Sequence, residues 1–331
     1  MWPLDWASQG LPAKILKVLT YMLRRTYLGL EIRHAGLCSI ALKRAGRRMA
    51  LAGGQTLALS EGTLEPAVLE PNVKQPEQFV AAVQEVLRPL TRRENRIAVA
   101  LPDAAGHLFL LDVETPFSKQ QEGEEIVRWQ LKDLLPPQLK KPAISYQVLE
   151  ERESGSRRVL VSLIAKEVLT QYEELLAKAG FAPALIDFSS LNIYNAFRSR
   201  VDLGRDFLLI SVEERQLTLL VFANLKLDFY RVKRITDDPE QVFQELNRTL
   251  TGYRNRHHAF NRFSVYLHSS WPQLETLQQA VAASFEQQVA LLPSPLQQLL
   301  NAEQLTLSTP AASSMAACLG VAERMIQRMN R

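Results

Sequence analysis

Cysteine, histidine and acidic side chains are the groups through which this sequence could carry out chemistry, and their spacing limits what that chemistry can be. Cys38 and Cys318 lie far apart in apolar surroundings, which favours neither a disulfide framework nor a zinc site. His257 and His258 follow two arginines at the end of an expected helix, where positive side chains complement the helix dipole. The motifs G-x-S-x-G, H-E-x-x-H and G-x-G-x-x-G and a Walker lysine do not occur. The residues alone therefore offer no established catalytic constellation.

Length and composition predict a folded chain with a sizeable core. The 331 residues are 47% hydrophobic and carry a formal net charge of +4. This length suits one bilobal domain or two ordinary domains. The charge excess is too small and too diffuse to indicate nucleic-acid binding. No apolar run reaches the roughly 18–20 residues of a spanning helix, and no signal-peptide pattern occurs, so we expect most of the chain to be cytoplasmic.

Residues 1–27 predict a basic amphipathic helix that precedes the main fold. Its apolar side carries Leu11, Ile15, Val18, Leu19, Met22 and Leu23. The opposite side carries Lys14, Lys17, Arg24 and Arg25, and Trp2 and Trp6 come before both sets. Such a helix can bind a membrane surface, because cations meet anionic headgroups while the apolar side enters the acyl boundary. Packing on the protein's own body or on a partner helix remains an alternative.

The rest of the chain predicts a three-strand meander that occurs twice, with an α+β unit between the copies. The first meander comprises strands 28–33, 36–43 and 48–58, and it is followed by helix 76–90 and strand 96–101. The middle unit comprises strand 108–113, helix 120–135, strands 143–149 and 157–164 and helix 166–179. Strand 184–187 and helix 189–200 return to the first unit. The second copy comprises strands 207–212, 216–222 and 225–231, helix 238–257, strand 262–267, helix 273–287 and a terminal helix near 311–329.

The stretch from Ile97 to Phe197 carries the most specific motifs. It reads IAVALPD, then a helix ending in LKDLLPP, then ISYQVLE and VLVSLIAKEVLTQYEELLAKAGFAPALIDFSSLNIYNAF. These motifs resemble the PilM-like proteins of type IV pilus assembly, in the branch of the actin-like ATPase superfamily that also contains FtsA. The residues in register with the family pattern are Lys166, Tyr172, Gly180, Asp187 and Asn195 to Phe197.

The resemblance implies an α/β, RNase H-like actin fold that is duplicated and carries an insertion. We expect residues 28–95 and 181–205 to form the first lobe (subdomain 1A). Residues 96–180 would form the inserted α+β subdomain (1C, SHS2-like), and residues 206–331 the second lobe (2A). The family has roughly forty more residues where RITDDPEQVFQEL runs directly into a helix, so we expect the second lobe to lack most of subdomain 2B.

The first nucleotide loop of the family is rewritten here. An actin-like fold holds nucleotide through two strand hairpins, each with an acidic residue and a glycine-rich turn whose N–H groups meet phosphate oxygens. The sequence LGLEIRHAGLCSIAL keeps an acid, Glu31, but Arg33 replaces the glycine and Cys38 the expected lysine. Arg33 can be an ordinary turn residue, or a guanidinium that clamps phosphate in an active ATPase.

The second loop and the adenosine motif are rewritten as well. In LISVEERQLTLL, Ser211 stands at the acid and Glu213 at the glycine, and Glu213 with Glu214 would repel polyphosphate. Ser269 and Ser270 replace the glycine pair that meets adenosine. The sequence therefore predicts a degenerate nucleotide site, no ATPase activity and no cofactor.

The resemblance also implies a partner and a place in the cell. PilM-like proteins lie at the cytoplasmic face of the inner membrane and grasp the cytoplasmic N-terminal tail of the membrane protein PilN, between the first lobe and its insertion. They link it to the pilus motor. Leu191, Tyr194 and Phe197 are candidates for a wall of that groove, or for pure core. Two alternatives stay open: an ATP-binding switch of the same machine, and a platform component of a type II secretion system.

Overall fold

The computed structural model describes residues 26–45, 48–91, 94–139, 141–297, 299 and 313–329. The predicted membrane-surface helix, with Trp2, Trp6, Lys14, Lys17, Arg24 and Arg25, lies outside the described residues. Within them, no helix has both the length and the apolar character needed to cross a membrane.

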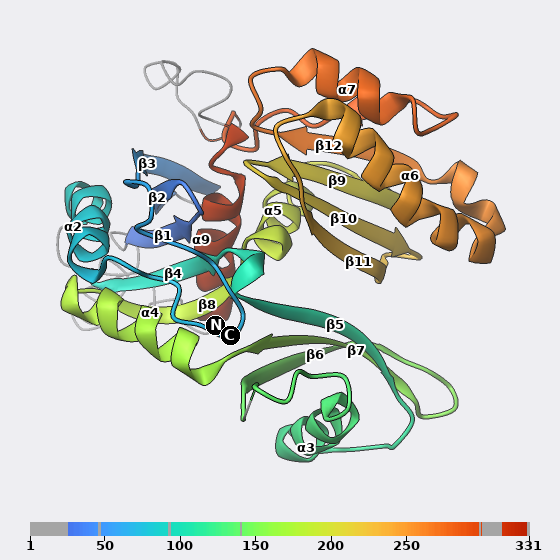
Figure 1. Ribbon diagram of the computed structural model, residues 1–331, viewed down its shortest axis with the longest axis horizontal. Coiled ribbons are helices and arrows are strands. Elements are labelled where there is room, and N and C mark those ends of the chain that lie inside the picture. Colours follow the sequence, from blue (N-terminus) through green and yellow to red (C-terminus); the bar gives the residue numbers. More distant parts are fainter. Residues whose placement is uncertain are drawn as a thin grey trace, which may run out of the picture.

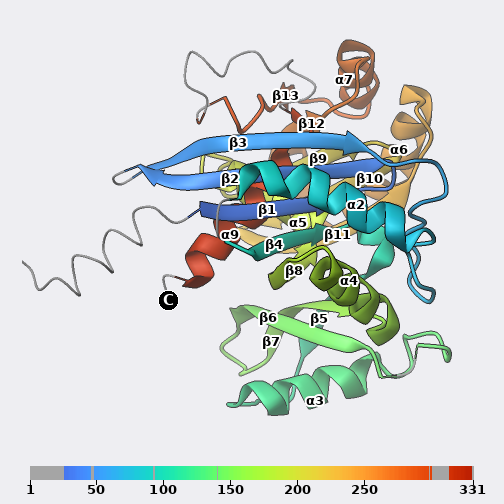
Figure 2. The same cartoon turned by 90° about the vertical axis from the view of Figure 1, so that its left-hand side faces the viewer.

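The first lobe is built on a five-stranded sheet in the order β3-β2-β1-β4-β8. An antiparallel meander is followed by two parallel strands: β1 (Thr26–Ile32), β2 (Gly36–Ala45), β3 (Arg48–Ala58), β4 (Arg96–Leu101) and β8 (Ala182–Phe188). Helices α2 (Pro76–Leu87) and α4 (Lys166–Lys178) lie on its outer face (Figure 2). A short 3-10 helix, η1 (Arg88–Leu90), extends α2.

The second lobe repeats this plan, with the strand order β11-β10-β9-β12-β13. Its strands are β9 (Phe207–Glu213), β10 (Gln216–Ala223), β11 (Lys226–Arg234), β12 (Ser264–Ser269) and β13 (Val289–Leu291). Its helices are α6 (Pro239–Arg256), η3 (His258–Arg262) and α7 (Leu274–Ala282). Only residues 235–238 connect β11 to α6. The duplicated α/β plan and the reduced second lobe predicted from the sequence are both present.

The insertion is a three-stranded antiparallel sheet, β5-β7-β6, with one helix on it. It consists of β5 (Gly106–Val113), α3 (Gln120–Leu131), β6 (Ala143–Glu151) and β7 (Arg157–Ile164), and η2 (Asp103–Ala105) leads into it. In Figure 1 it lies below the two lobes. The predicted boundaries 96–180 were too wide. Strand β4 is the fourth strand of the first sheet, because its apolar run is buried and pairs with β1 on one side and β8 on the other. Helix α4 packs on the first lobe too.

Helix α5 (Ser189–Arg198) and the terminal helix α9 (Ala316–Met329) lie between the two sheets (Figure 1). The sequence placed α9 in the second lobe, but it packs on β1, β4 and α5 of the first. Small residues bring the elements close. A Cβ built on Gly320 would lie 1.9 Å from the Asn192 carbonyl oxygen, and one built on Gly29 would lie 2.4 Å from the Cys318 carbonyl oxygen. Helix α9 is therefore part of the core of the first lobe.

Candidate functional site: the cleft between the lobes

The hairpin turns that correspond to the two nucleotide loops of the family, the β1–β2 turn and the β9–β10 turn, contact each other. The β1–β2 turn is closed by a 2.9 Å hydrogen bond from the Arg33 N–H to the Gly36 carbonyl. The β9–β10 turn places Glu214 in the left-handed region, with φ of 47°. The Glu214 carboxylate accepts a hydrogen bond from the backbone N–H of Ala35. A direct contact thus bridges the lobes at the two turns.

Arg33 is held by the protein's own acids. Its Nη2 lies 2.6 Å from Glu31 Oε2, and the two side chains are only 16% and 6% exposed. Burial raises the pKa of Glu31 to about 7, against the opposing effect of the Arg33 charge, and the charges of Glu213 and Glu214 add to the increase. Glu31 and Arg33 form an ion pair, and the charges of Glu213 and Glu214 act on it from the second lobe. We call these four residues the cleft cluster: Glu31, Arg33, Glu213 and Glu214.

The serines that replace the adenosine glycines bind the second turn instead of facing an open cleft. Ser270 Oγ donates to Glu213 Oε2 at 2.5 Å, and Ser269 Oγ donates to the Val212 carbonyl at 2.7 Å. His268 Nε2 lies 3.0 Å from Glu213 Oε1. The indole of Trp271 donates to the Glu214 carbonyl at 2.8 Å. Residues 268–271 therefore hold the second turn in place.

The other two residues of the predicted loops are buried within the sheets, and Cys38 lies opposite Glu31 in the pairing of β1 with β2. Cys38 is fully buried in the apolar contact with α9, where the Cys318 thiol donates to its carbonyl at 3.2 Å. Both cysteines are free thiols. Ser211 is buried on β9, and its hydroxyl has no hydrogen-bond partner among the described residues. The structure therefore brings Glu31 and Arg33 together in the first lobe and Glu213 and Ser270 together in the second, and it buries the Cys38 side chain in the apolar contact with α9.

A depression of ≈ 430 Å³ adjoins the cluster on the side of the second lobe. Glu214, Asp237, Ser270, Trp271, Pro272 and Gln273 line it. Its two carboxylates disfavour a polyphosphate, because like charges repel at short range. In the part of the chain that the structure describes, no three His, Cys, Asp or Glu side chains are placed to hold a metal ion. The depression therefore presents negative charge beside the second turn.

Sequence reasoning missed the role of Asp103, although Asp103 ends the motif IAVALPD. Its carboxylate is buried and accepts hydrogen bonds from both lobes. The donors are the Ser190 N–H (3.2 Å), Gln216 Nε2 (3.0 Å), Tyr230 Oη (2.9 Å) and the Ser190 hydroxyl. Burial raises the pKa of Asp103, and the hydrogen bonds oppose this. Asp103 is therefore a second link between the lobes.

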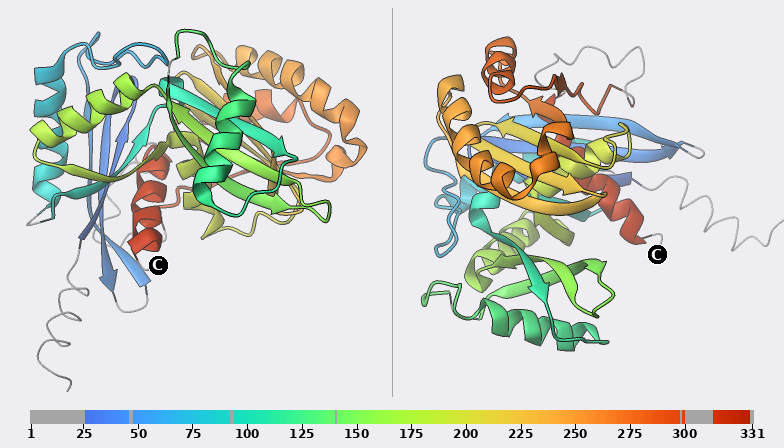
Figure 3. Two further views of the ribbon diagram at one scale, coloured as in Figure 1. Left: turned by 90° about the horizontal axis from the view of Figure 1, so that it is seen from below. Right: turned by 90° about the vertical axis from the view of Figure 1, so that its right-hand side faces the viewer.

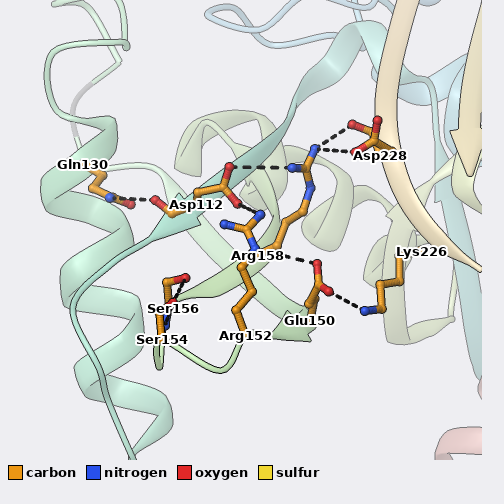
Figure 4. Close-up of polar contacts among 9 residues, drawn as sticks. All are labelled: Asp112, Gln130, Glu150, Arg152, Ser154, Ser156, Arg158, Lys226 and Asp228. Atoms are coloured by element: carbon orange, nitrogen blue, oxygen red, sulfur yellow. Dashed lines mark hydrogen bonds and ion pairs between the residues drawn. The ribbon is translucent and has the colours of Figure 1, made fainter. Parts of the chain in front are cut away.

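Ion pairs also tie the insertion to the second lobe (Figure 4). Arg158 of β7 donates to the Asp228 carbonyl of β11 at 2.6 Å, and its guanidinium lies 3.4 Å from the Asp228 carboxylate and 3.6 Å from that of Asp112. Lys226 of β11 pairs with Glu150 of β6. Since β5, β6 and β7 all contribute to these pairs or lie beside them, the sheet of the insertion is fixed against the edge of the second lobe.

The predicted groove residues lie on α5, and the structure gives them different environments. Phe197 is 1% exposed, and its ring contacts His268 of the second lobe with centroids 4.9 Å apart. Of the two alternatives for Phe197, groove wall or core, its burial fits the core. Tyr194 is half-buried and stacks on Phe222 at 4.4 Å. Leu191 is half-buried and is the member of this set that packs in no described apolar cluster.

These features define the class of protein: an actin-like fold with two duplicated lobes and an α+β insertion. Within this class the structure is similar to the PilM–PilN type IV pilus biogenesis complex, with a TM-score of 0.76 and 20% identity over 91% of this chain and 98% of that chain. A Bacteroides thetaiotaomicron protein of actin-like ATPase fold and unknown function gives a TM-score of 0.51 and 12% identity, over 84% and 96%. No family model and no curated protein matches the chain. The predicted PilM-like form of the fold is confirmed.

A weaker structural similarity concerns a protein of a type II secretion system, the alternative left open in the sequence analysis. The cytoplasmic domain of EpsL, an inner-membrane component of the type II secretion system of Vibrio cholerae, gives a TM-score of 0.49 and 11% identity, over 78% of this chain and 96% of that chain. Similarity at this level carries no argument about function.

The raised pKa of Glu31 predicts a specific dependence of stability on pH. The ordinary pKa of a glutamate is 4.5 and that of Glu31 in the folded chain is about 7, so the folded state binds more protons than the unfolded state between these values. The free energy of unfolding of the wild type should therefore fall relative to that of Glu31→Gln as pH rises through this window, by up to ~3 kcal/mol. Urea unfolding of both proteins at a series of pH values measures the difference. A difference that does not change with pH would show that Glu31 titrates normally, and one of opposite sign would show that its pKa is lowered; either result contradicts the prediction.

Proposed function

We propose that this chain is a non-catalytic scaffold of PilM type, which binds the N-terminal tail of a PilN-like membrane protein and links it to the pilus motor. The observation that carries the proposal is the extent of the fold likeness to the PilM–PilN complex, which covers 91% of this chain and 98% of the other. The scaffold would act at the cytoplasmic face of the inner membrane, held there by its partner.

The filled cleft supports a function that needs no ATP turnover. Arg33 already forms a 2.6 Å ion pair with Glu31, so a phosphate would have to displace a buried carboxylate to reach the guanidinium. The Glu214 carboxylate accepts from the Ala35 N–H, so this N–H of the first turn already has an acceptor and would have to give it up to bind phosphate. Protein side chains thus make the contacts between the lobes that a nucleotide makes in an active member of the superfamily.

The tail would bind as an extended peptide on the side of the first lobe that adjoins the insertion. Recognition of this kind uses main-chain hydrogen bonds and apolar contacts to alternate side chains. Leu191 is our candidate contact, because its side chain is half-buried and stays outside the core that holds Phe197. The ion pairs between the insertion and the second lobe would keep the binding surface in one conformation, which lowers the entropy lost on binding.

A synthetic peptide of the PilN-like tail, labelled for fluorescence anisotropy, tests the proposal. The wild-type chain should bind it, and Leu191→Asp should weaken binding by about tenfold or more, since a carboxylate would be desolvated in an apolar contact. The matched control is Leu225→Asp, which makes the same substitution at an exposed leucine of the second lobe. It should leave the affinity unchanged. No binding by the wild type would remove the proposal, and equal loss in both variants would remove Leu191 from the site.

A further inference from the structure

The end of helix α6 and the segment after it form a region of one charge sign. From residue 246 to residue 274 the sequence contains four arginines and no aspartate or glutamate. Arg248 is engaged by Glu245 at 2.5 Å. Arg254 turns inward, where it donates to the Ser284 carbonyl at 2.5 Å and lies over the ring of Phe285. Two of the four arginines thus have structural roles, and Arg256 and Arg262 remain.

These two arginines and a histidine between them face solvent. Arg256, His258 and Arg262 are all exposed, at the C-terminal end of α6 and along η3. Arg256 contacts only the Gly252 carbonyl, at 3.2 Å through Nε, and no acidic side chain of the described residues forms an ion pair with either arginine. Two acidic residues of the second lobe interact with other side chains. The Asp228 carboxylate accepts a hydrogen bond from Tyr253, and the charge of Glu286 acts on Arg254.

A depression of ≈ 290 Å³ lies beside this surface and contains Arg262 in its wall. The other polar side chains in the wall are neutral: Asn261, Ser264, Tyr266, Gln287 and Gln288. The wall includes no carboxylate, and its hydroxyl and amide groups can donate hydrogen bonds. An arginine beside neutral donors suits a carboxylate, which a guanidinium binds through two parallel hydrogen bonds.

We infer that this arginine surface, defined by Arg256, His258 and Arg262 with the adjoining depression, binds an acidic segment of a partner protein. One carboxylate of the segment would enter the depression beside Arg262, and a second would meet Arg256. A lipid surface is the poorer fit, because none of the exposed large hydrophobic side chains lies on α6 or η3. A nucleic acid would need a longer cationic track with aromatic platforms.

The C-terminal end of α6, which carries Arg256, lies at the end of the second lobe away from the first lobe, as Figures 1 and 3 show in different views. It is therefore separate from the surface around α5 that we propose for the membrane-protein tail. One chain can hold both partners at once, which is what a scaffold between two components requires. The inference does not depend on the identity of the first partner.

Fluorescence anisotropy with a labelled hexaglutamate peptide and the full chain provides the test. The double variant Arg256→Glu/Arg262→Glu should weaken binding by about tenfold or more. The matched control is Lys166→Glu/Lys178→Glu, which makes the same charge change on two exposed residues of α4. It should keep the affinity within about twofold, because distant surface charges are screened at physiological salt.

Three results would overturn the inference. The first is that the wild-type chain fails to bind the peptide. The second is an equal loss in both double variants, which would show attraction to net charge alone. The third is tighter binding, through the same two arginines, of a single-stranded oligonucleotide or of anionic vesicles than of the peptide. Far-UV circular dichroism and thermal melting of each variant establish that the changes leave the fold intact.

Discussion

Gly320→Ala is expected to lower the free energy of unfolding by about 3 kcal/mol, at the upper end of what one added methyl group costs in a packed core. The added Cβ would lie 1.9 Å from the Asn192 carbonyl oxygen and 2.7 Å from the carbonyl carbon. Both atoms belong to the backbone of α5, so no side chain can rotate away. Helix α9 must move off α5, and its contacts with β1 and β4 must shift with it. Urea denaturation of the variant measures the loss.

Gly252→Ala is the control, because it makes the same chemical change in another helix. A Cβ at Gly252 would have nothing within 4 Å, and the residue lies on the exposed side of α6. Alanine favours a helix over glycine by about 0.8–1 kcal/mol, so this variant should be slightly more stable than the wild type. Equal effects at the two glycines would mean that α9 does not pack on α5 as closely as described.

Asp103→Ala is expected to produce the second large loss, of roughly 3 kcal/mol. The change leaves donors from Ser190, Gln216 and Tyr230 without their acceptor at a buried position. The loss stays below the sum of these bonds, because burial of the Asp103 carboxylate is itself unfavourable, as its raised pKa indicates. Since Gln216 and Tyr230 belong to the second lobe and Ser190 to the first, amide hydrogen exchange should also become faster in the β10–β11 hairpin.

Tyr230→Phe is the control that distinguishes loss of the hydrogen bonds to Asp103 from the general destabilisation caused by a mutation in the core. It removes one donor to Asp103 and keeps the ring, so it should cost about 1 kcal/mol. If Asp103→Ala costs no more than Tyr230→Phe, Asp103 is not the point where the lobes are joined, and the cleft cluster must hold them alone.

The duplicated architecture could be predicted because its signals are local. Alternating apolar residues and glycine-containing turns identify both meanders, and strand 96–101 was predicted with the same bounds as β4. Assignment to lobes was less accurate, because β4, α4 and α9 join the first lobe through contacts between residues distant in sequence. Strand β13 was not predicted, since three residues are too few for a periodic pattern. The helix expected over 120–135 ends at Leu131, before the exposed Leu134.

The candidate site could be predicted as a set of residues but not as an arrangement. The family resemblance located Glu31, Arg33, Glu213 and Ser270, and these do meet in the cleft. Sequence left open whether Arg33 is a turn residue or a phosphate clamp, because the answer depends on which acid its guanidinium reaches. The sequence also left open whether Phe197 lines a groove or belongs to the core, because periodicity identifies an apolar face without showing what covers it. In the structure the second lobe covers it.

Calorimetric titration of the full chain with ATP and Mg²⁺ tests the central claim, that protein side chains fill the position of the nucleotide. The predicted result is no binding heat at micromolar protein, because Arg33 is paired with Glu31 and the turns touch through Glu214 and Ala35. Arg33→Gly restores the family's residue in the first turn but leaves Glu213 and Glu214 in the second, so it too should show no binding. Saturable binding of ATP in the micromolar range by the wild-type chain would contradict the account.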